Sequence, residues 1–261
     1  MCPTVDPLPD RASSEELPAR PAALFVGNAL WLDFVNTRYI ERNGPVDVLA
    51  SFGALVDWLV EAGALTAGDA YAATARWDGT AAGADVLARA LVLRDTLYDL
   101  AELLATRAAR RIEGSQEKGK RERKGAMPEE REHTIPVAMA RAVAAINAIL
   151  RADVRYDEIS LTQPPAHGDA GARFERRTHR TDFAPSSLLA PLADSASELL
   201  CGGDASRVHL CGNPKCVLYF YDTTRNRRRR FCTPEGCGNR VKAAARYRRS
   251  RESAAKLNVQ P

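Results

Sequence analysis

The sequence has no apolar run of the roughly 18–20 residues needed to cross a bilayer, so no membrane-spanning helix is predicted. Its first 25 residues are acidic and rich in proline rather than basic and then apolar, so we expect a cytoplasmic protein without a secretory leader. The chain also lacks a G-x-S-x-G sequence, a P-loop and a G-x-G-x-x-G sequence, and three of its four histidines fall in charged or turn-rich contexts. We therefore expect no enzymatic activity and no membrane partner.

The residues that are present are typical of a globular protein with an uneven distribution of charge. A chain of 261 residues with 45% apolar and 27% charged residues predicts one or two domains and excludes fibrous or wholly disordered classes. Residues 205–261 contain 14 Lys and Arg against three Asp and Glu; they contribute +11 to the net charge of +4, so the preceding residues carry −7. An acidic body with a basic end predicts a C-terminal module that binds polyanions.

The spacing of apolar residues predicts a mainly α fold with a small β-hairpin. Helices are expected at 51–62, 85–111, 135–150 and 187–201, and two strands at 155–162 and 173–183. Residues 1–22 have almost no apolar side chains and are expected to be a disordered tail, and the charged segment 113–133 is expected to be a flexible insert. Composition, charge and cysteine density all change at Gly202–Gly203, which predicts a helical domain over 23–203 and a second domain over 204–261.

Four of the six cysteines form the pattern C-x4-C, fifteen residues, C-x4-C, made of Cys211, Cys216, Cys232 and Cys237. Zinc takes four soft ligands in a tetrahedron, and two short cysteine loops can supply them. With all four positions filled by cysteine, the predicted site holds one structural Zn²⁺ per chain; structural or redox-active thiols without metal are the alternative. Residues 217–231 between the two loops alternate apolar and polar side chains around a turn, which predicts a β-hairpin.

A basic helix is predicted after the last cysteine, since residues from 240 onward are rich in alanine and arginine and contain no proline or glycine before the last residue. Lys242, Arg246 and Arg249 share one stripe of this helix, and Arg240, Tyr247 and Arg251 share another. Val241, Ala244, Ala245 and the stem of Arg248 are left to pack on the cysteine loops. A basic helix anchored by a metal site is typical of zinc modules that enter the major groove of DNA. The predicted nucleic-acid contacts are Arg227, Arg228, Arg229, Arg230, Arg240, Lys242, Arg246, Arg249 and Arg251.

Asp33, Asn36 and Thr37 are polar residues within an otherwise apolar stretch. They are expected either to satisfy backbone groups at the ends of elements or to line a pocket for a small-molecule effector. In both cases we expect the three side chains to be buried.

Two stretches of the chain resemble known families. Cys237-Gly238-Asn239-Arg240, within the wider pattern of residues 207–250, resembles the CGNR zinc finger. Residues 27–37, GNALWLDFVNT, resemble the G-x-x-L-x-L-D-F-x-N-T motif that opens the ABATE domain of stress-induced bacterial transcription regulators. The resemblance implies a mainly helical N-terminal domain and a zinc-dependent, DNA-binding C-terminus.

The sequence therefore predicts a transcription regulator that binds double-stranded DNA and responds to stress or to a ligand through its N-terminal domain, with a homodimer as one form it can take. The alternative is an RNA-binding or translation-associated protein, because Tyr219, Phe220 and Tyr221 could stack on unpaired bases.

Overall fold

The computed structural model of the protein describes residues 22–41, 44–121, 136–162, 173–180 and 183–257. The fold is mainly helical, as predicted, and its helices are α1 (Leu30–Val35), α2 (Phe52–Glu61), α3 (Ala67–Trp77), α4 (Ala81–Arg121), α5 (Val137–Ala152), α6 (Ala190–Gly202) and α7 (Asn239–Leu257). The strands form three two-stranded antiparallel sheets: β1 (Arg38–Glu41) with β2 (Gly44–Asp47), β3 (Arg155–Thr162) with β4 (Arg173–Arg180), and β5 (Val208–Leu210) with β6 (Tyr219–Tyr221). No helix within the described ranges is both long and apolar enough to span a membrane.

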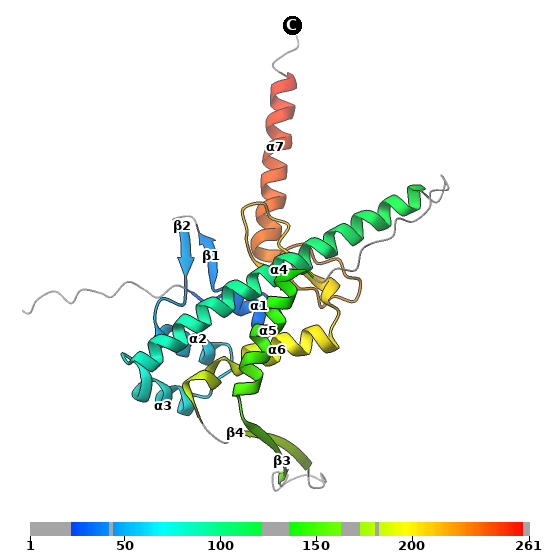
Figure 1. The fold of residues 1–261 in the computed structure, drawn as a ribbon. Coiled ribbons are helices and arrows are strands. Elements are labelled where there is room, and N and C mark those ends of the chain that lie inside the picture. The colour runs from blue at the N-terminus through cyan, green and yellow to red at the C-terminus, as the bar shows by residue number, and fades with distance from the viewer. Residues whose placement is uncertain (1–21, 42–43, 122–135, 163–172, 181–182, 258–261) are drawn as a thin grey trace, which may run out of the picture.

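Helix α4 is the central element, and it crosses the whole molecule in Figure 1. The sequence predicts that one face of this helix is apolar, and the structure confirms that the face is buried: Val86, Ala90, Leu93, Leu97, Leu100, Leu104 and Ala108. Helices α1, α2 and α5 and strand β5 all pack against α4. The hydrophobic core is therefore organised around this one helix.

The predicted boundaries of α2, α5 and α6 lie within three residues of those in the structure, and at α2 a capping residue marks the start. Ser51 precedes α2, and its hydroxyl accepts a hydrogen bond from the backbone N–H of Ala54 at 3.1 Å. The hairpin β3–β4 also agrees with the prediction. Helix α3 and the hairpin β1–β2 were not predicted, since α3 has only two buried side chains, Ala73 and Trp77, and the β1 and β2 segments are four residues each.

The charged segment 113–133 differs from its prediction as a flexible insert, because α4 continues as a helix to Arg121. Glycine lowers helix stability by only about 1 kcal/mol and residues 113–121 contain no proline, so Gly114 does not end the helix. Residues 122–133 of the predicted insert and residues 1–21 of the predicted tail lie outside the described ranges.

The hydrophobic core extends across the predicted domain boundary at Gly202–Gly203. Val208, Tyr219 and Phe220 belong to the same buried cluster as Trp31 and Leu97. The ring of Tyr219 meets that of Tyr98 on α4 edge to face, with 5.4 Å between the ring centroids. The segment that carries the four cysteines is thus packed directly on the helical body.

Candidate metal centre

Three short elements bring the four cysteines together. Cys211 and Cys216 lie in the loop between β5 and β6, Cys232 follows the arginine-rich loop, and Cys237 lies in the helical turn η3 (Pro234–Gly238) that leads into α7. Their sulfur atoms all lie within 4.8 Å of one another. Three of these side chains are buried, and that of Cys216 is half-buried.

The geometry of this cluster fits a tetrahedral zinc ion. Four sulfurs about 2.3 Å from a zinc ion lie about 3.8 Å from one another, and the Sγ atoms of Cys216 and Cys232 are 3.9 Å apart. Thiolates bind zinc in preference to hard cations such as Mg²⁺ and Ca²⁺, which need oxygen ligands. Because cysteine fills all four positions, the cluster can hold one structural metal ion and leaves no open position for catalysis.

Hydrogen bonds from neighbouring groups to the sulfurs complete the centre. The backbone N–H of Cys232 donates to the Sγ of Cys211 at 3.4 Å, and the Asn213 side-chain amide donates to the Sγ of Cys237 at 3.3 Å. Hydrogen bonds with Cys216 and Cys232 hold the pKa of Cys211 below its ordinary value, and the same contacts with Cys211 raise the pKa values of Cys216 and Cys232. The two N–H donors stabilise negative charge on the sulfurs of Cys211 and Cys237, and the thiolate is the form that binds a metal.

The predicted hairpin within residues 217–231 is wrong, because β6 pairs with β5 instead. Tyr221 lies opposite Val208 and Tyr219 lies opposite Leu210. The predicted turn is instead organised by the buried Asp222, whose carboxylate accepts hydrogen bonds from the backbone N–H groups of Thr224 and Arg229. The following run of arginines has no apolar side chains with which a second strand could cover the core.

Arg229 does not point to solvent as a nucleic-acid contact would. Its guanidinium lies 4.3 Å from the ring centroid of Phe220 and donates to the carbonyl oxygen of Val26 at 2.8 Å. It also donates to the carbonyl oxygens of Phe231 and Cys232. Arg229 therefore holds the metal loop to the N-terminal segment, and its prediction as a phosphate contact is corrected.

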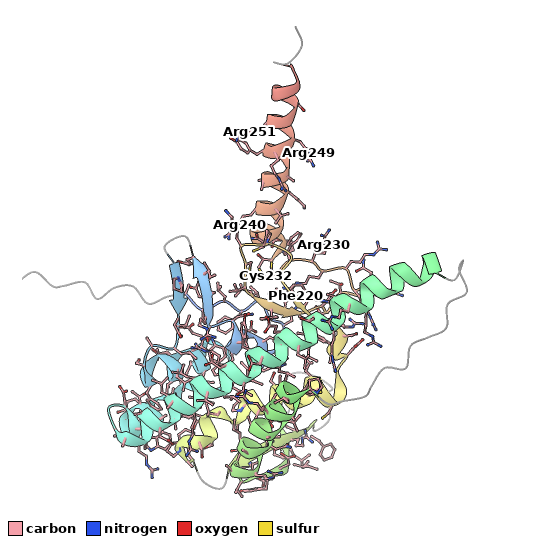
Figure 2. All side chains as sticks on the ribbon, turned by 45° about the horizontal axis from the view of Figure 1, so that its top comes forward. Phe220, Arg230, Cys232, Arg240, Arg249 and Arg251 are labelled. Carbon is pink, nitrogen blue, oxygen red and sulfur yellow. The ribbon has the colours of Figure 1, made fainter. Side chains whose placement is uncertain are left out.

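The other predicted nucleic-acid contacts are exposed. Arg227 pairs with Asp204 at 3.0 Å, while Arg228 and Arg230 lie on the surface of the loop. Helix α7 projects away from the body, with Arg240 near its base and Arg249 and Arg251 further out (Figure 2). Where the exposure of α7 side chains is described, the exposed basic residues are Arg240, Lys242, Arg246, Arg248, Arg249 and Arg251.

The expected packing of α7 on the cysteine loops is limited to its first turns. Val241 and Ala245 are half-buried, whereas Ala244 and Arg248 are exposed, contrary to the prediction. The helix leaves the body directly after the metal cluster, so its outer turns have no apolar surface beneath them (Figure 1). Cys237, two residues before α7, belongs to the buried core cluster.

Asn36 joins the N-terminal motif to the metal-binding segment. Its amide nitrogen donates to the carbonyl oxygen of Tyr219 at 2.8 Å, and its amide oxygen accepts from the backbone N–H of Tyr219 at 2.9 Å. Gly27 and Asn28 make similar bonds to Tyr221: the Tyr221 N–H donates to the Gly27 carbonyl at 2.7 Å, and the Asn28 amide donates to the Tyr221 carbonyl at 3.1 Å. The N-terminal motif thus occupies the edge of β6 that faces away from β5.

Asp33 and Thr37 are also buried, and both hold nearby backbone in place. Asp33 accepts a hydrogen bond from the Gly27 N–H at 2.6 Å, and a side chain at Gly27 would collide with Asp33 and Leu32. Thr37 donates to the Phe34 carbonyl at 2.7 Å and accepts from Arg94 at 3.0 Å. The structure therefore gives the three polar residues of the motif internal contacts that support the fold.

Sequence reasoning did not identify Arg94, the only arginine among the buried side chains of the described ranges. Its guanidinium forms two hydrogen bonds with the carboxylate of Asp47, at 2.7 and 2.6 Å, and thereby ties α4 to β2. The sequence does indicate that Arg94 is buried, since it lies between Ala90 and Leu97 on the apolar face of the predicted helix.

Asp33 is expected to make stability depend on pH. Burial raises its pKa to about 6, although hydrogen bonds from Gly27 and Val26 oppose the shift. Because the folded pKa exceeds the unfolded value of about 3.9, the folded protein binds more protons between about pH 4 and pH 6, and the contribution of Asp33 to stability falls as pH rises through this window. Asp33→Asn, whose amide oxygen can still accept the Gly27 N–H, should remove this part of the dependence.

Urea unfolding of the wild type and of Asp33→Asn across this pH range measures the effect. The difference in free energy of unfolding between the two proteins isolates Asp33 from every other titrating group. A difference that stays constant from about pH 4 to pH 6 would contradict the assignment.

Comparison with protein families agrees with this architecture. Residues 28–203 match the ABATE family model, described as "Putative stress-induced transcription regulator", and residues 207–250 match the CGNR zinc finger. A comparison with curated proteins found no match. The ABATE match covers more than half of the chain, and the CGNR match contains the four clustered cysteines. The chain therefore belongs to the ABATE family and carries a CGNR zinc finger after its ABATE domain.

Proposed function

We propose that the protein is a transcription regulator that binds double-stranded DNA by inserting α7 into the major groove. The observation that carries the proposal is the position of α7, a basic helix that leaves the body at the metal cluster and exposes Arg240, Lys242, Arg246, Arg248, Arg249 and Arg251. A helix of 19 residues is about 28 Å long, and a major groove about 12 Å wide accepts an α-helix.

Charge supports the same orientation. The last 57 residues carry a formal charge of +11 and the rest of the chain carries −7, so a DNA duplex is attracted to the finger and repelled by the body. The exposed Arg228 and Arg230 lie on the loop beside the base of α7, where they can contact phosphates next to the groove that the helix enters.

Zinc has a positioning role in this proposal. Cys237 lies in the turn that opens α7, and Cys211, Cys216 and Cys232 belong to the loops packed on the body. When bound, the metal supplies crosslinks between these loops and the helix. The thiolates thereby fix the direction in which α7 leaves the body, so DNA binding is expected to depend on zinc.

The RNA-binding alternative rested on base stacking by the aromatic residues of β6. Tyr219 and Phe220 are buried, at 2% and 0% exposure, and Phe220 is covered by Arg229. These two rings cannot reach a base without unfolding the core. No observation on the described residues favours RNA over DNA, and comparing a duplex DNA with a single-stranded RNA at the same salt concentration tests the choice.

Arg246→Ala and Arg249→Ala are expected to weaken duplex binding with little loss of zinc, since both side chains are exposed and far from the sulfurs. Each lost phosphate contact should lower the magnitude of the slope of log K against log salt by about 0.9. A residue that reads a base should instead cost about 1–3 kcal/mol on the preferred site. Arg141→Ala on α5, also an exposed helical arginine, is the matched control.

Fluorescence anisotropy with a labelled duplex at several salt concentrations measures both quantities. If the two α7 variants bind like the wild type and like the Arg141→Ala control, α7 is not the DNA-binding helix.

A further inference from the structure

The burial of the first turns of α7 shows which side of the helix is turned away from the body. Val241 and Ala245, one turn apart, are half-buried, whereas the residues next to them in the sequence are exposed. Successive residues of an α-helix are about 100° apart around its axis, so Ala243 points in the direction opposite these two side chains. Asn239 and Ser250 lie within about 40° of Ala243 and are exposed as well. Asn239, Ala243 and Ser250 form the outer strip of α7, which carries no charge.

Basic side chains border the outer strip on both sides. One border consists of the exposed Lys242, Arg246 and Arg249, and the other of the exposed Arg240, Tyr247 and Arg251. Figure 2 shows Arg240 and Arg251 on one side of the helix and Arg249 on the other. A helix in the major groove has base edges in front of it and one phosphate strand on each side. The uncharged strip between two borders that can bind phosphates has the same arrangement, since the hydroxyl of Tyr247 can also donate to a phosphate.

We propose that the outer strip reads the base edges of the duplex and selects sites that contain A·T pairs, an inference that rests on the proposed function. The Asn239 amide can pair with the N6 and N7 groups of adenine, and the methyl group of Ala243 can contact the methyl group of thymine. The Ser250 hydroxyl can bond to more than one kind of base. Guanine is bound in the commonest specific contacts by arginine or lysine, and the outer strip contains neither.

The dimensions of the outer strip set the length of the site. Asn239 and Ser250 are about 16 Å apart along the helix axis. The phosphates of one strand repeat about every 3.4 Å of duplex, so a helix that lies along the groove passes about five base pairs between these two residues. A helix with its side chains is about 10–12 Å across and the groove is about 12 Å wide, so the small side chain of Ala243 lets the backbone approach the bases.

Selection of preferred sites from a random duplex pool, with the full-length protein purified without chelator, is the first measurement. We expect the selected duplexes to share A·T pairs within a run of about five base pairs. Replacing the shared pairs one at a time with G·C should weaken wild-type binding by about 5- to 150-fold, the equivalent of one base contact. Asn239→Ala should lose the preference at one of these pairs while its zinc content stays at the wild-type value.

The matched pair Ala243→Leu and Ala244→Leu tests which side of α7 faces the bases. Both alanines are exposed, and leucine keeps a high helix propensity without adding charge. Ala243→Leu should weaken binding to the selected duplex by at least about 5-fold, because the larger side chain holds the helix away from the bases. Its slope of log K against log salt should stay at the wild-type value, since no basic side chain is lost. Ala244→Leu, which is turned about 100° away, should bind as the wild type does.

The outcomes separate this inference from the proposed function. If Arg246→Ala lowers the slope but Ala243→Leu and Ala244→Leu have equal effects on binding, the outer strip does not face the bases and the role of α7 stands. Selected sites made only of G·C pairs would assign base reading to the arginines of the borders, and selected duplexes without a shared sequence would exclude base reading; each result refutes the inference. If the protein binds no duplex DNA, the proposed function fails, and the inference fails with it.

Discussion

Removing the metal is expected to destabilise the helical body as well as to unfold the zinc finger. Structural zinc sites contribute an apparent free energy of about 10–16 kcal/mol to the folding of small finger peptides. In this protein the finger is not a separate globule, because Val208, Tyr219 and Phe220 are part of the core that contains α1 and α4. Loss of the finger's structure would expose that part of the core to water, at a cost of about 25 cal/mol per Å² of apolar surface.

The tryptophans allow the two effects to be separated. All three, Trp31, Trp58 and Trp77, lie in the helical body, so their fluorescence reports on that part alone. Cys211→Ser should abolish stoichiometric zinc binding and also lower the urea midpoint of the tryptophan transition. Cys201→Ser, outside the cluster, should change neither property.

Two results would contradict these expectations. A tryptophan transition with an unchanged midpoint in Cys211→Ser would show that the body folds independently of the finger. Less than half an equivalent of zinc in wild-type protein purified without chelator would contradict the metal centre itself.

Local patterns in the sequence were sufficient to predict most of the helices and the cysteine cluster. The apolar spacing from Val86 to Ala108 determines the buried face of α4, because the side chains of one helical stripe must face the same neighbour. Likewise, the two C-x4-C loops predict a four-sulfur site, since their ligands are close in sequence and only the two loops must meet.

Contacts between distant segments could not be predicted in this way. Strand β6 can pair with either of its neighbours in sequence, and its pairing with β5 depends on how the finger docks on the body. Arg229 is one of four consecutive arginines, yet it alone is directed inward, because the Val26 carbonyl and the ring of Phe220 lie beside it. Neither neighbour is indicated by the local sequence.

Because β6 docks on the N-terminal motif through Asn36, the substitution Asn36→Ala is expected to cause a large loss of stability. One edge of strand β6 pairs with β5. On the opposite edge, the backbone N–H and carbonyl of Tyr219 both bond to the side-chain amide of Asn36, which is their only partner among the described hydrogen bonds. Asn36 is 1% exposed and Tyr219 is 2% exposed, so water cannot replace the lost amide without opening the core. A buried polar group left without a partner costs about 1–3 kcal/mol.

Asn36→Ala is therefore expected to lower the free energy of unfolding by about 2–5 kcal/mol, since both the N–H and the carbonyl of Tyr219 lose their partner. Asn36→Asp keeps the acceptor for the Tyr219 N–H but loses the donor and buries a charge, so it should be at least as destabilising at neutral pH and should recover part of the loss as the pH falls. Urea unfolding measured by tryptophan fluorescence checks both variants. Asn226→Ala, at an exposed position in the arginine-rich loop, is the control, and it should change the free energy of unfolding by less than about 0.5 kcal/mol. If Asn36→Ala also stays within that range, the Asn36 amide does not hold the zinc finger to the ABATE domain.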